Sequence, residues 1–184
     1  MQIDDHWLTS ATAHPSPFFN ARPDGEISLL VIHNIALPPK TYGGPWIEHL
    51  FAGQLDTSQH PYFTQLEGLE VSAHLLIRRT GQIIQFVGFD QRAWHAGRSV
   101  FEGREQCNDF SIGIELEGSD DQPYTEQQYR QLIAVTHSLM QTYPEITQQH
   151  IVGHQQIAPE RKTDPGPAFD WPYFLSQLAS TQDG

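Results

Sequence analysis

The apolar residues of this chain fall into short runs, most of them too short for a helix. Residues 28–35, SLLVIHNI, are a continuous run of leucine and β-branched residues that predicts a buried strand ending near His33 and Asn34. Residues 71–89 hold two more such runs around Thr80-Gly81, which predicts a hairpin. A further short strand is expected at HIVGH, residues 150–154.

Residues 110–117 show the strictest alternation of apolar and polar positions, which predicts a strand with two different faces. Apolar side chains are expected on one face, namely Phe110, Ile112, Ile114 and Leu116. Small and acidic residues are expected on the other, namely Ser111, Gly113, Glu115 and Glu117. The second face therefore leaves room for something above it.

Helical spacing is clearest over residues 129–143, which follow a capping-box pair, Thr125 and Gln128. A short helix is expected from Pro45 to Gly53, and a last one over residues 171–180 after an Asp170 cap. Residues 54–69 and 90–109 have no clear period and are expected to form irregular loops.

Interleaved strands and helices without repeats predict an α/β fold with a central mixed β-sheet flanked by helices. A length of 184 residues suits one domain, because domains average roughly 150 residues. We therefore expect a single domain spanning residues 1–184.

Composition and charge narrow the classes of partner. A hydrophobic share of 38% is typical of a globular chain, and no apolar run approaches the ~20 residues of a membrane span, so no membrane partner is expected. A formal net charge of −12 disfavours nucleic acid. The acidic start, MQIDD, and a lone cysteine, Cys107, favour the cytoplasm.

Polar residues follow the predicted strands in a way that suggests a metal site. His33, Glu115 and His154 lie at or near strand ends, and Asp164 follows on a proline-rich loop, IAPERKTDPGPAFDW, that also holds Lys162. Two imidazoles and a carboxylate are a common catalytic zinc set that leaves one position for water. No compact motif such as H-E-x-x-H is present, so spacing alone leaves structural histidines as the alternative.

Four segments occur in order that together carry a resemblance. They are LLVIHNIALPPKTYGGPWI, VSAHLLIRRTGQIIQFVGFDQRAWHAG, CNDFSIGIELEG and GHQQIAPERKTDPGPAFDW. They resemble the signature segments of AmpD-type anhydro-N-acetylmuramyl-L-alanine amidases, cytoplasmic bacterial enzymes of the zinc amidase superfamily that includes peptidoglycan recognition proteins. The similarity extends from HPSPFFNARPDG to FDWPYF, nearly the whole chain.

The resemblance implies the peptidoglycan recognition protein-like fold and a Zn²⁺ ion held by His33, His154 and Asp164. It also implies that Glu115 and Lys162 are catalytic. The implied reaction is hydrolysis of the amide between the lactyl group of 1,6-anhydro-N-acetylmuramic acid and L-alanine, during peptidoglycan recycling. The expected partner is a small soluble anhydromuramyl-peptide, and a monomer is the expected state.

Substrate contacts are expected at Asn34, which can hydrogen-bond a peptide carbonyl, and at Trp94, whose ring resembles a family position that packs on the substrate. Ordinary loop packing is the alternative for both. Glu70 and Gln106 depart from the family, which carries arginine at both places to bind substrate carboxylates. These departures affect the expected peptide preference and leave the zinc chemistry unchanged.

Three other functions are compatible with the same residues. One is a broader N-acetylmuramoyl-L-alanine amidase acting on intact peptidoglycan, and another is a non-catalytic peptidoglycan-binding module. A metallohydrolase for a different amide is the third. All three candidate ligands are present, which disfavours the non-catalytic module.

Overall fold

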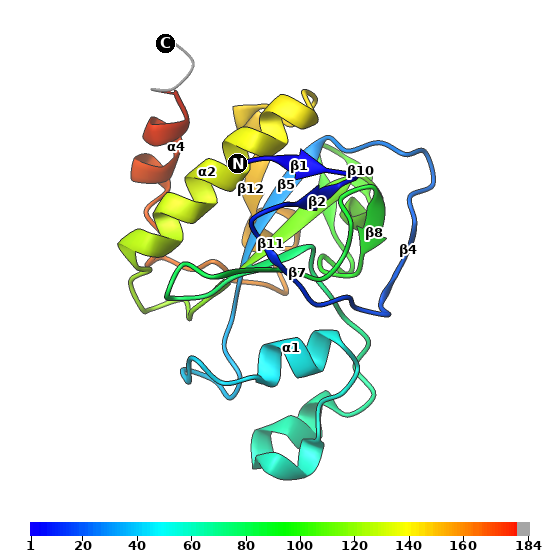
Figure 1. Cartoon of the computed structure of the whole chain (residues 1–184), viewed down its shortest axis with the longest axis vertical. Coiled ribbons are helices and arrows are strands. Elements are labelled where there is room, and N and C mark those ends of the chain that lie inside the picture. Colours follow the sequence, from blue (N-terminus) through cyan, green and yellow to red (C-terminus); the bar gives the residue numbers. More distant parts are fainter. Residues whose placement is uncertain (180–184) are drawn as a thin grey trace.

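A six-stranded mixed sheet forms the centre of the computed structural model, which describes residues 1–179 (Figure 1). Its strands, in spatial order, are β12 (Ile151–Gly153), β5 (Leu29–Ile35), β11 (Ser111–Glu117), β6 (Leu75–Ile77), β7 (Ile83–Gln85) and β3 (Thr12–Ala13). The first four are parallel, whereas β6 and β7 form the antiparallel hairpin. The predicted α/β class and central mixed sheet are confirmed.

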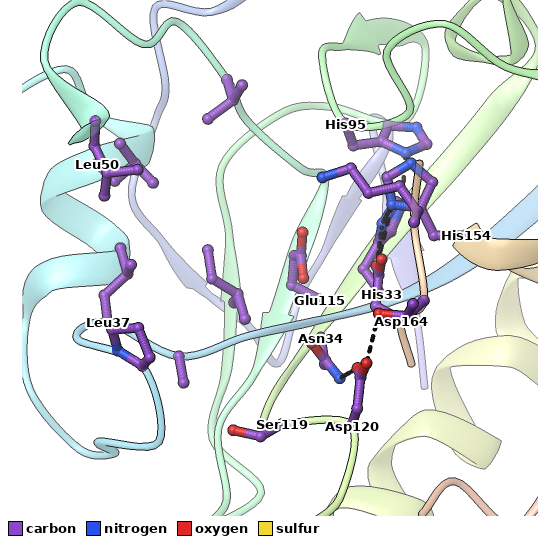
Figure 2. A pocket seen from close by; sticks show the side chains of 18 of the residues that line it. His33, Asn34, Leu37, Leu50, His95, Glu115, Ser119, Asp120, His154 and Asp164 are labelled. Atoms are coloured by element: carbon purple, nitrogen blue, oxygen red, sulfur yellow. Dashed lines mark hydrogen bonds and ion pairs between the residues drawn. The ribbon is translucent and has the colours of Figure 1, made fainter. Parts of the chain in front are cut away.

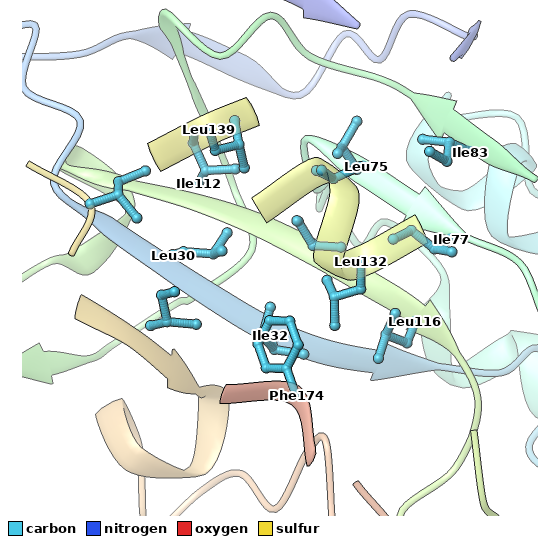
Figure 3. Packing of buried hydrophobic residues seen from close by; sticks show 14 of the residues in the cluster. Leu30, Ile32, Leu75, Ile77, Ile83, Ile112, Leu116, Leu132, Leu139 and Phe174 are labelled. Atoms are coloured by element: carbon cyan, nitrogen blue, oxygen red, sulfur yellow. The ribbon is translucent and has the colours of Figure 1, made fainter. Parts of the chain in front are cut away.

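Two helices cover one face of this sheet. They are α2 (Glu126–Thr142) and α4 (Trp171–Ala179), which lie side by side in Figure 1. Figure 3 shows Leu132 and Leu139 of α2 and Phe174 of α4 packed on the strands. The strand residues beneath them include Leu30, Ile32, Leu75, Ile77, Ile112 and Leu116. This layer is the main hydrophobic core.

The opposite face is covered by shorter segments. Helix α1 (Trp46–Phe51) and the 3₁₀ turn Pro61–Leu66 pack Ile47, Leu50, Phe51 and Phe63 against Leu76 and Ile84. Helix α3 (His154–Ile157) follows β12 directly. In Figure 1, α1 and the turns after it project from the end of the molecule away from α4.

The helix signals in the sequence are confirmed in detail. Thr125 and Gln128 form the reciprocal capping box at the start of α2. The Asp170 carboxylate accepts the Tyr173 N–H at the start of α4. Ser180, which the sequence places in this last helix, lies outside the described residues.

The irregular segments contain more structure than their sequence indicates. The additional strands are β1 (Ile3–Asp4), β2 (Trp7–Leu8), β4 (Phe19–Ala21), β8 (Gln91–Ala93), β9 (Val100–Phe101) and β10 (Arg104–Glu105). The other 3₁₀ turns are Thr57–Gln59, Cys107–Asp109 and Gln148–His150. Elements of two or three residues are too short to show a hydrophobic period.

Strand β11 differs from its prediction in two respects. All seven of its residues are buried, because loops also cover the polar face. Phe110 lies outside the strand and packs with Leu29 and Val31, so it does not share a face with Ile112. Among residues 1–179, no helix is long and apolar enough to span a membrane.

Candidate active site

The carboxyl ends of three adjacent parallel strands deliver the candidate residues to one place. His33 on β5 lies opposite Glu115 on β11, and His154 immediately follows β12, which pairs with β5 up to Ile32. Ligand sites in open α/β sheets form at this end of the strands. A cavity of about 800 Å³ opens there and is lined by all three residues.

His33, His154 and Asp164 converge within this cavity (Figure 2). The Nδ1 atoms of the two histidines are 3.0 Å apart, and each is 3.1 Å from Asp164 Oδ2. The histidines are 1% and 3% exposed, and the three residues form a group able to hold a metal ion. The structure thus brings together the three predicted ligands.

The chemistry of this donor set fits a divalent cation. His154 Nε2 donates to the carbonyl oxygen of Ala96 at 3.0 Å, so in the neutral ring Nδ1 carries the lone pair. Asp164 Oδ2 is also an acceptor, and His33 Nδ1 faces both. Two imidazole nitrogens and one carboxylate oxygen with an open side are typical of catalytic zinc.

The pKa shifts favour the same ligand states. Burial, the largest effect, lowers the pKa of His33 to about 4 and keeps its ring neutral near pH 7. Burial alone would raise the pKa of Asp164, but its close contacts with the rings of His154 and His33 outweigh burial and hold that pKa well below its usual range. Metal binding requires a neutral imidazole and an ionised carboxylate, which are the states favoured at His33 and Asp164.

Glu115 has the environment expected of a proton-accepting carboxyl group. Its side chain lines the cavity at 9% exposure, and its Oε2 atom is buried without a hydrogen-bond partner. Burial raises its pKa well above the usual value, the charge of Asp164 adds to this, and Lys162 opposes it. A carboxyl group with a raised pKa and a free oxygen can exchange protons with a substrate or water.

Glu117, two residues along the strand from Glu115, is buried and fully engaged in structural contacts. It is 2% exposed and accepts a hydrogen bond from Arg78 at 2.9 Å. The backbone N–H groups of Gly43 and Arg79 also donate to it. Glu117 is therefore a structural ion-pair partner, whereas Glu115 faces the cavity.

The proline-rich loop separates the functions of its two basic residues. Lys162 lines the cavity with Asp164. Arg161 also lines the cavity, but its guanidinium donates to the carbonyl oxygens of Ala96 and Arg98, at 2.7 and 2.8 Å. The loop is connected back to α3 by the Gln155 N–H, which donates to the Asp164 carbonyl oxygen.

Asn34 and Trp94 both line the cavity, and each also has a structural contact. The Asn34 amide donates to Asp120 Oδ1 at 2.8 Å and lies within hydrogen-bond distance of the Pro165 carbonyl oxygen. The Trp94 indole N–H donates to Asn20 Oδ1 at 2.6 Å. Their roles toward a substrate stay predictions.

The wall of the cavity opposite the metal ligands is apolar. It is formed by the segment around α1 and includes Leu37, Leu50, Phe51, Tyr62 and Leu66. Figure 2 shows Leu37 and Leu50 facing the polar cluster across the cavity. A ligand that fits both walls has a polar end and an apolar surface.

The structure adds two residues that the sequence did not single out as site residues, Asp120 and Ser111. Asp120 bridges Asn34 and Thr163, and Ser111 lies within hydrogen-bond distance of His95. His95 itself lies 2.9 Å from His33. Asp120 lies outside the family segments, and Ser111 lies in one that assigned it no role, so only the three-dimensional contacts identify them.

The N-acetylmuramoyl-L-alanine amidase family model matches residues 23–167, which include every candidate ligand. The chain belongs to this family. The AmpD enzyme of Salmonella typhimurium (strain SL1344), a 1,6-anhydro-N-acetylmuramyl-L-alanine amidase, is 58% identical over 97% of this chain and 96% of its own length. The resemblance to AmpD-type amidases is confirmed, and this family member is an amide hydrolase.

Solved structures of amidases have the same fold. A crystal structure of an AmpD derivative superposes with a TM-score of 0.95 at 57% identity, covering 97% of this amidase and 99% of that chain. The amidase AmiD from E. coli, in complex with anhydro-N-acetylmuramic acid-L-Ala-D-gamma-Glu-L-Lys, gives a TM-score of 0.61 at 28% identity. That match covers 93% of this chain and 60% of AmiD.

Proposed function

We propose that this amidase hydrolyses the amide bond between the lactyl group of 1,6-anhydro-N-acetylmuramic acid and L-alanine, using Zn²⁺ held by His33, His154 and Asp164. The observation that carries the proposal is the convergence of their three ligand atoms, 3.0–3.1 Å from one another, beside a carboxyl oxygen of Glu115 without a partner. The anhydromuropeptide substrate is supported by the names of the relatives and by the ligand bound to AmiD.

In this mechanism the chain supplies proton transfer and charge stabilisation. A bound Zn²⁺ ion supplies Lewis acidity and lowers the pKa of a water ligand to about 7. Glu115 accepts the proton of the attacking water and returns it to the departing amine of L-alanine. The Lys162 ammonium group stabilises the negative charge that develops on the carbonyl oxygen. Asn34 and Trp94 hold the peptide and the sugar.

The cavity suits such a substrate in size and polarity. About 800 Å³ falls within the range of roughly 300–1,000 Å³ for small-molecule sites. The apolar wall, with Leu37 and Leu50, offers a surface to the sugar ring or to alkyl groups. The polar wall holds the reacting amide.

The proposal places the amidase domain over residues 1–184, in the cytoplasm, as part of peptidoglycan recycling. Cys107 is buried as a free thiol, which suits a reducing compartment. The family match over residues 23–167 and the 97% coverage by AmpD relatives support the domain limits.

The decisive test is mass spectrometry of an anhydromuramyl-tripeptide incubated with the enzyme, with and without a chelator. We expect release of the free peptide and the anhydrosugar, loss of this activity with the chelator, and recovery on adding Zn²⁺. Intact sacculi are tested in parallel. Preferential cleavage of sacculi would replace this proposal with the broader amidase, and no cleavage of either would support a binding module.

Replacement of the ligands tests the metal centre separately from turnover. His33→Ala, His154→Ala and Asp164→Ala should each lose stoichiometric zinc, measured by mass spectrometry under native conditions. His60→Ala is the control, because this exposed histidine caps a 3₁₀ turn and does not line the cavity. A ligand variant that retained full zinc would be removed from the set.

Variants of the proposed catalytic residues should behave in the opposite way to the ligand variants. Glu115→Gln and Lys162→Ala should keep zinc and fold while losing roughly 10²-fold or more in kcat. Circular dichroism and metal content check the first part, and steady-state kinetics check the second. Near-normal turnover in either variant would contradict its catalytic role.

A further inference from the structure

One loop contacts the outer nitrogen of both histidine ligands. His33 Nε2 lies 2.9 Å from His95 Nδ1, and His154 Nε2 donates to the carbonyl oxygen of the next residue, Ala96, at 3.0 Å. Ligand histidines generally need such a partner, because it selects the tautomer and the orientation of the ring. The adjacent pair His95-Ala96 supplies it for both rings.

The chain of contacts that begins at His33 continues from His95 to Ser111. His95 Nε2 lies 3.1 Å from the Ser111 hydroxyl, at the start of β11. A hydroxyl can accept a hydrogen bond while it donates another, so the Ser111 hydroxyl can accept a hydrogen bond from the Nε2–H of His95. His95 Nδ1 is then a free acceptor directed at His33.

Taking the proposed metal centre as its basis, we infer that His95 is a positioning residue: its Nδ1 accepts the Nε2 proton of His33, so that the His33 Nδ1 lone pair is directed at the metal. Ser111 completes the chain by accepting the Nε2 proton of His95. The opposite arrangement, with protons on His95 Nδ1 and His33 Nδ1, would place a proton where the ion binds.

The surrounding residues fix His95 in this place. A side-chain carbon on Gly113 would lie 2.4 Å from His95 Cγ, so the glycine of β11 provides the space for the imidazole. The Asn108 side-chain oxygen accepts the backbone N–H groups of His95 and Ala96, at 3.2 and 2.8 Å. Arg161 donates to the Ala96 carbonyl oxygen from the other side, at 2.7 Å. Three hydrogen bonds thus hold the segment that orients the ligands.

A matched pair of variants separates the hydrogen bond from simple packing. His95→Asn and His95→Leu have similar size, but only asparagine keeps an acceptor atom near the position of Nδ1. We expect His95→Leu to lose about 10–100-fold in zinc affinity, and His95→Asn to recover most of that loss. Zinc affinity is measured by competition with a chromophoric chelator at pH 7, with the free energy of unfolding of each apo-protein determined beside it.

A second measurement uses the unmodified enzyme and does not depend on the folding of a variant. In the zinc-loaded protein, ¹⁵N shifts of the imidazole nitrogens should show the proton of both His33 and His95 on Nε2. A His95 proton on Nδ1 would overturn the inference, as would equal zinc affinity of the leucine and asparagine variants. A wild-type enzyme that bound no zinc would instead overturn the metal centre itself, and this inference with it.

Discussion

Arg78 connects the apolar wall of the cavity to the central sheet, and its removal should destabilise the protein strongly. Its guanidinium donates to Glu117 at 2.9 Å and to the Gly44 carbonyl oxygen at 2.8 Å, and it also pairs with Glu48 of α1. The side chains of Arg78 and Glu117 are 10% and 3% exposed. Water therefore has little access to the Glu117 carboxylate and cannot solvate its charge when the Arg78 cation is removed.

The structure sets the size of the effect for Arg78→Leu. Removing one partner of a buried ion pair costs about 3–5 kcal/mol. Glu117 keeps the N–H groups of Gly43 and Arg79, at 2.6 and 3.0 Å, so the lower end of about 3 kcal/mol applies. At roughly 2–4 °C per kcal/mol for a chain of this size, Tm should fall by roughly 6–12 °C.

Urea denaturation at pH 7 measures this loss, with circular dichroism as the signal and the m-value as a check on two-state behaviour. Lys40→Met is the control, since Lys40 and Asp121 form an exposed pair and no measurable change is expected. Adding Glu117→Gln to Arg78→Leu should restore part of the stability, because it removes the unpaired charge. A loss below about 1 kcal/mol for Arg78→Leu, as for a surface pair, would refute the reasoning.

Three further predictions concern Gly113, His74 and Glu70. Gly113→Ala should displace His95 and lower zinc affinity, as chelator competition would show. Burial, helped by the charge of Arg22, lowers the pKa of His74 to about 3 from 6.5, so the folded protein resists a proton that the unfolded chain accepts. Stability should therefore fall below pH 6.5 by up to about 1.4 kcal/mol per pH unit, less steeply in His74→Asn when measured by urea titration. Glu70→Arg should lower KM for peptides with free carboxylates and leave kcat unchanged.

The parts of the fold predicted well are those with a long hydrophobic period or a local signal. The run 28–35 and the capping box at Thr125 gave β5 and α2 nearly to the residue. The two-residue strands β9 and β10 have no such signal, because their pairing depends on distant contacts. Phe110 shows the same limit, since one residue outside the strand it turns to the other face.

The candidate ligands could be predicted because they lie beside recognisable sequence patterns. His33 and His154 follow apolar runs, and the family segments assigned Asp164 on its loop. His95 lies in a family segment but was not assigned a role, because a histidine beside a tryptophan is more often structural. Its contact with His33 arises from the space above Gly113, which is a property of packing.

The strand order has a consequence for how the protein is made. His33 and His154 are 121 residues apart in the chain, yet their rings meet because β12 adds to the sheet edge beside β5. A ribosome-bound chain that stops at residue 153 contains only one of the three candidate ligands and cannot form the proposed metal site. At the proposed metal centre, zinc would therefore be acquired only after the edge strand docks, and metal content would report on completed synthesis as well as on folding.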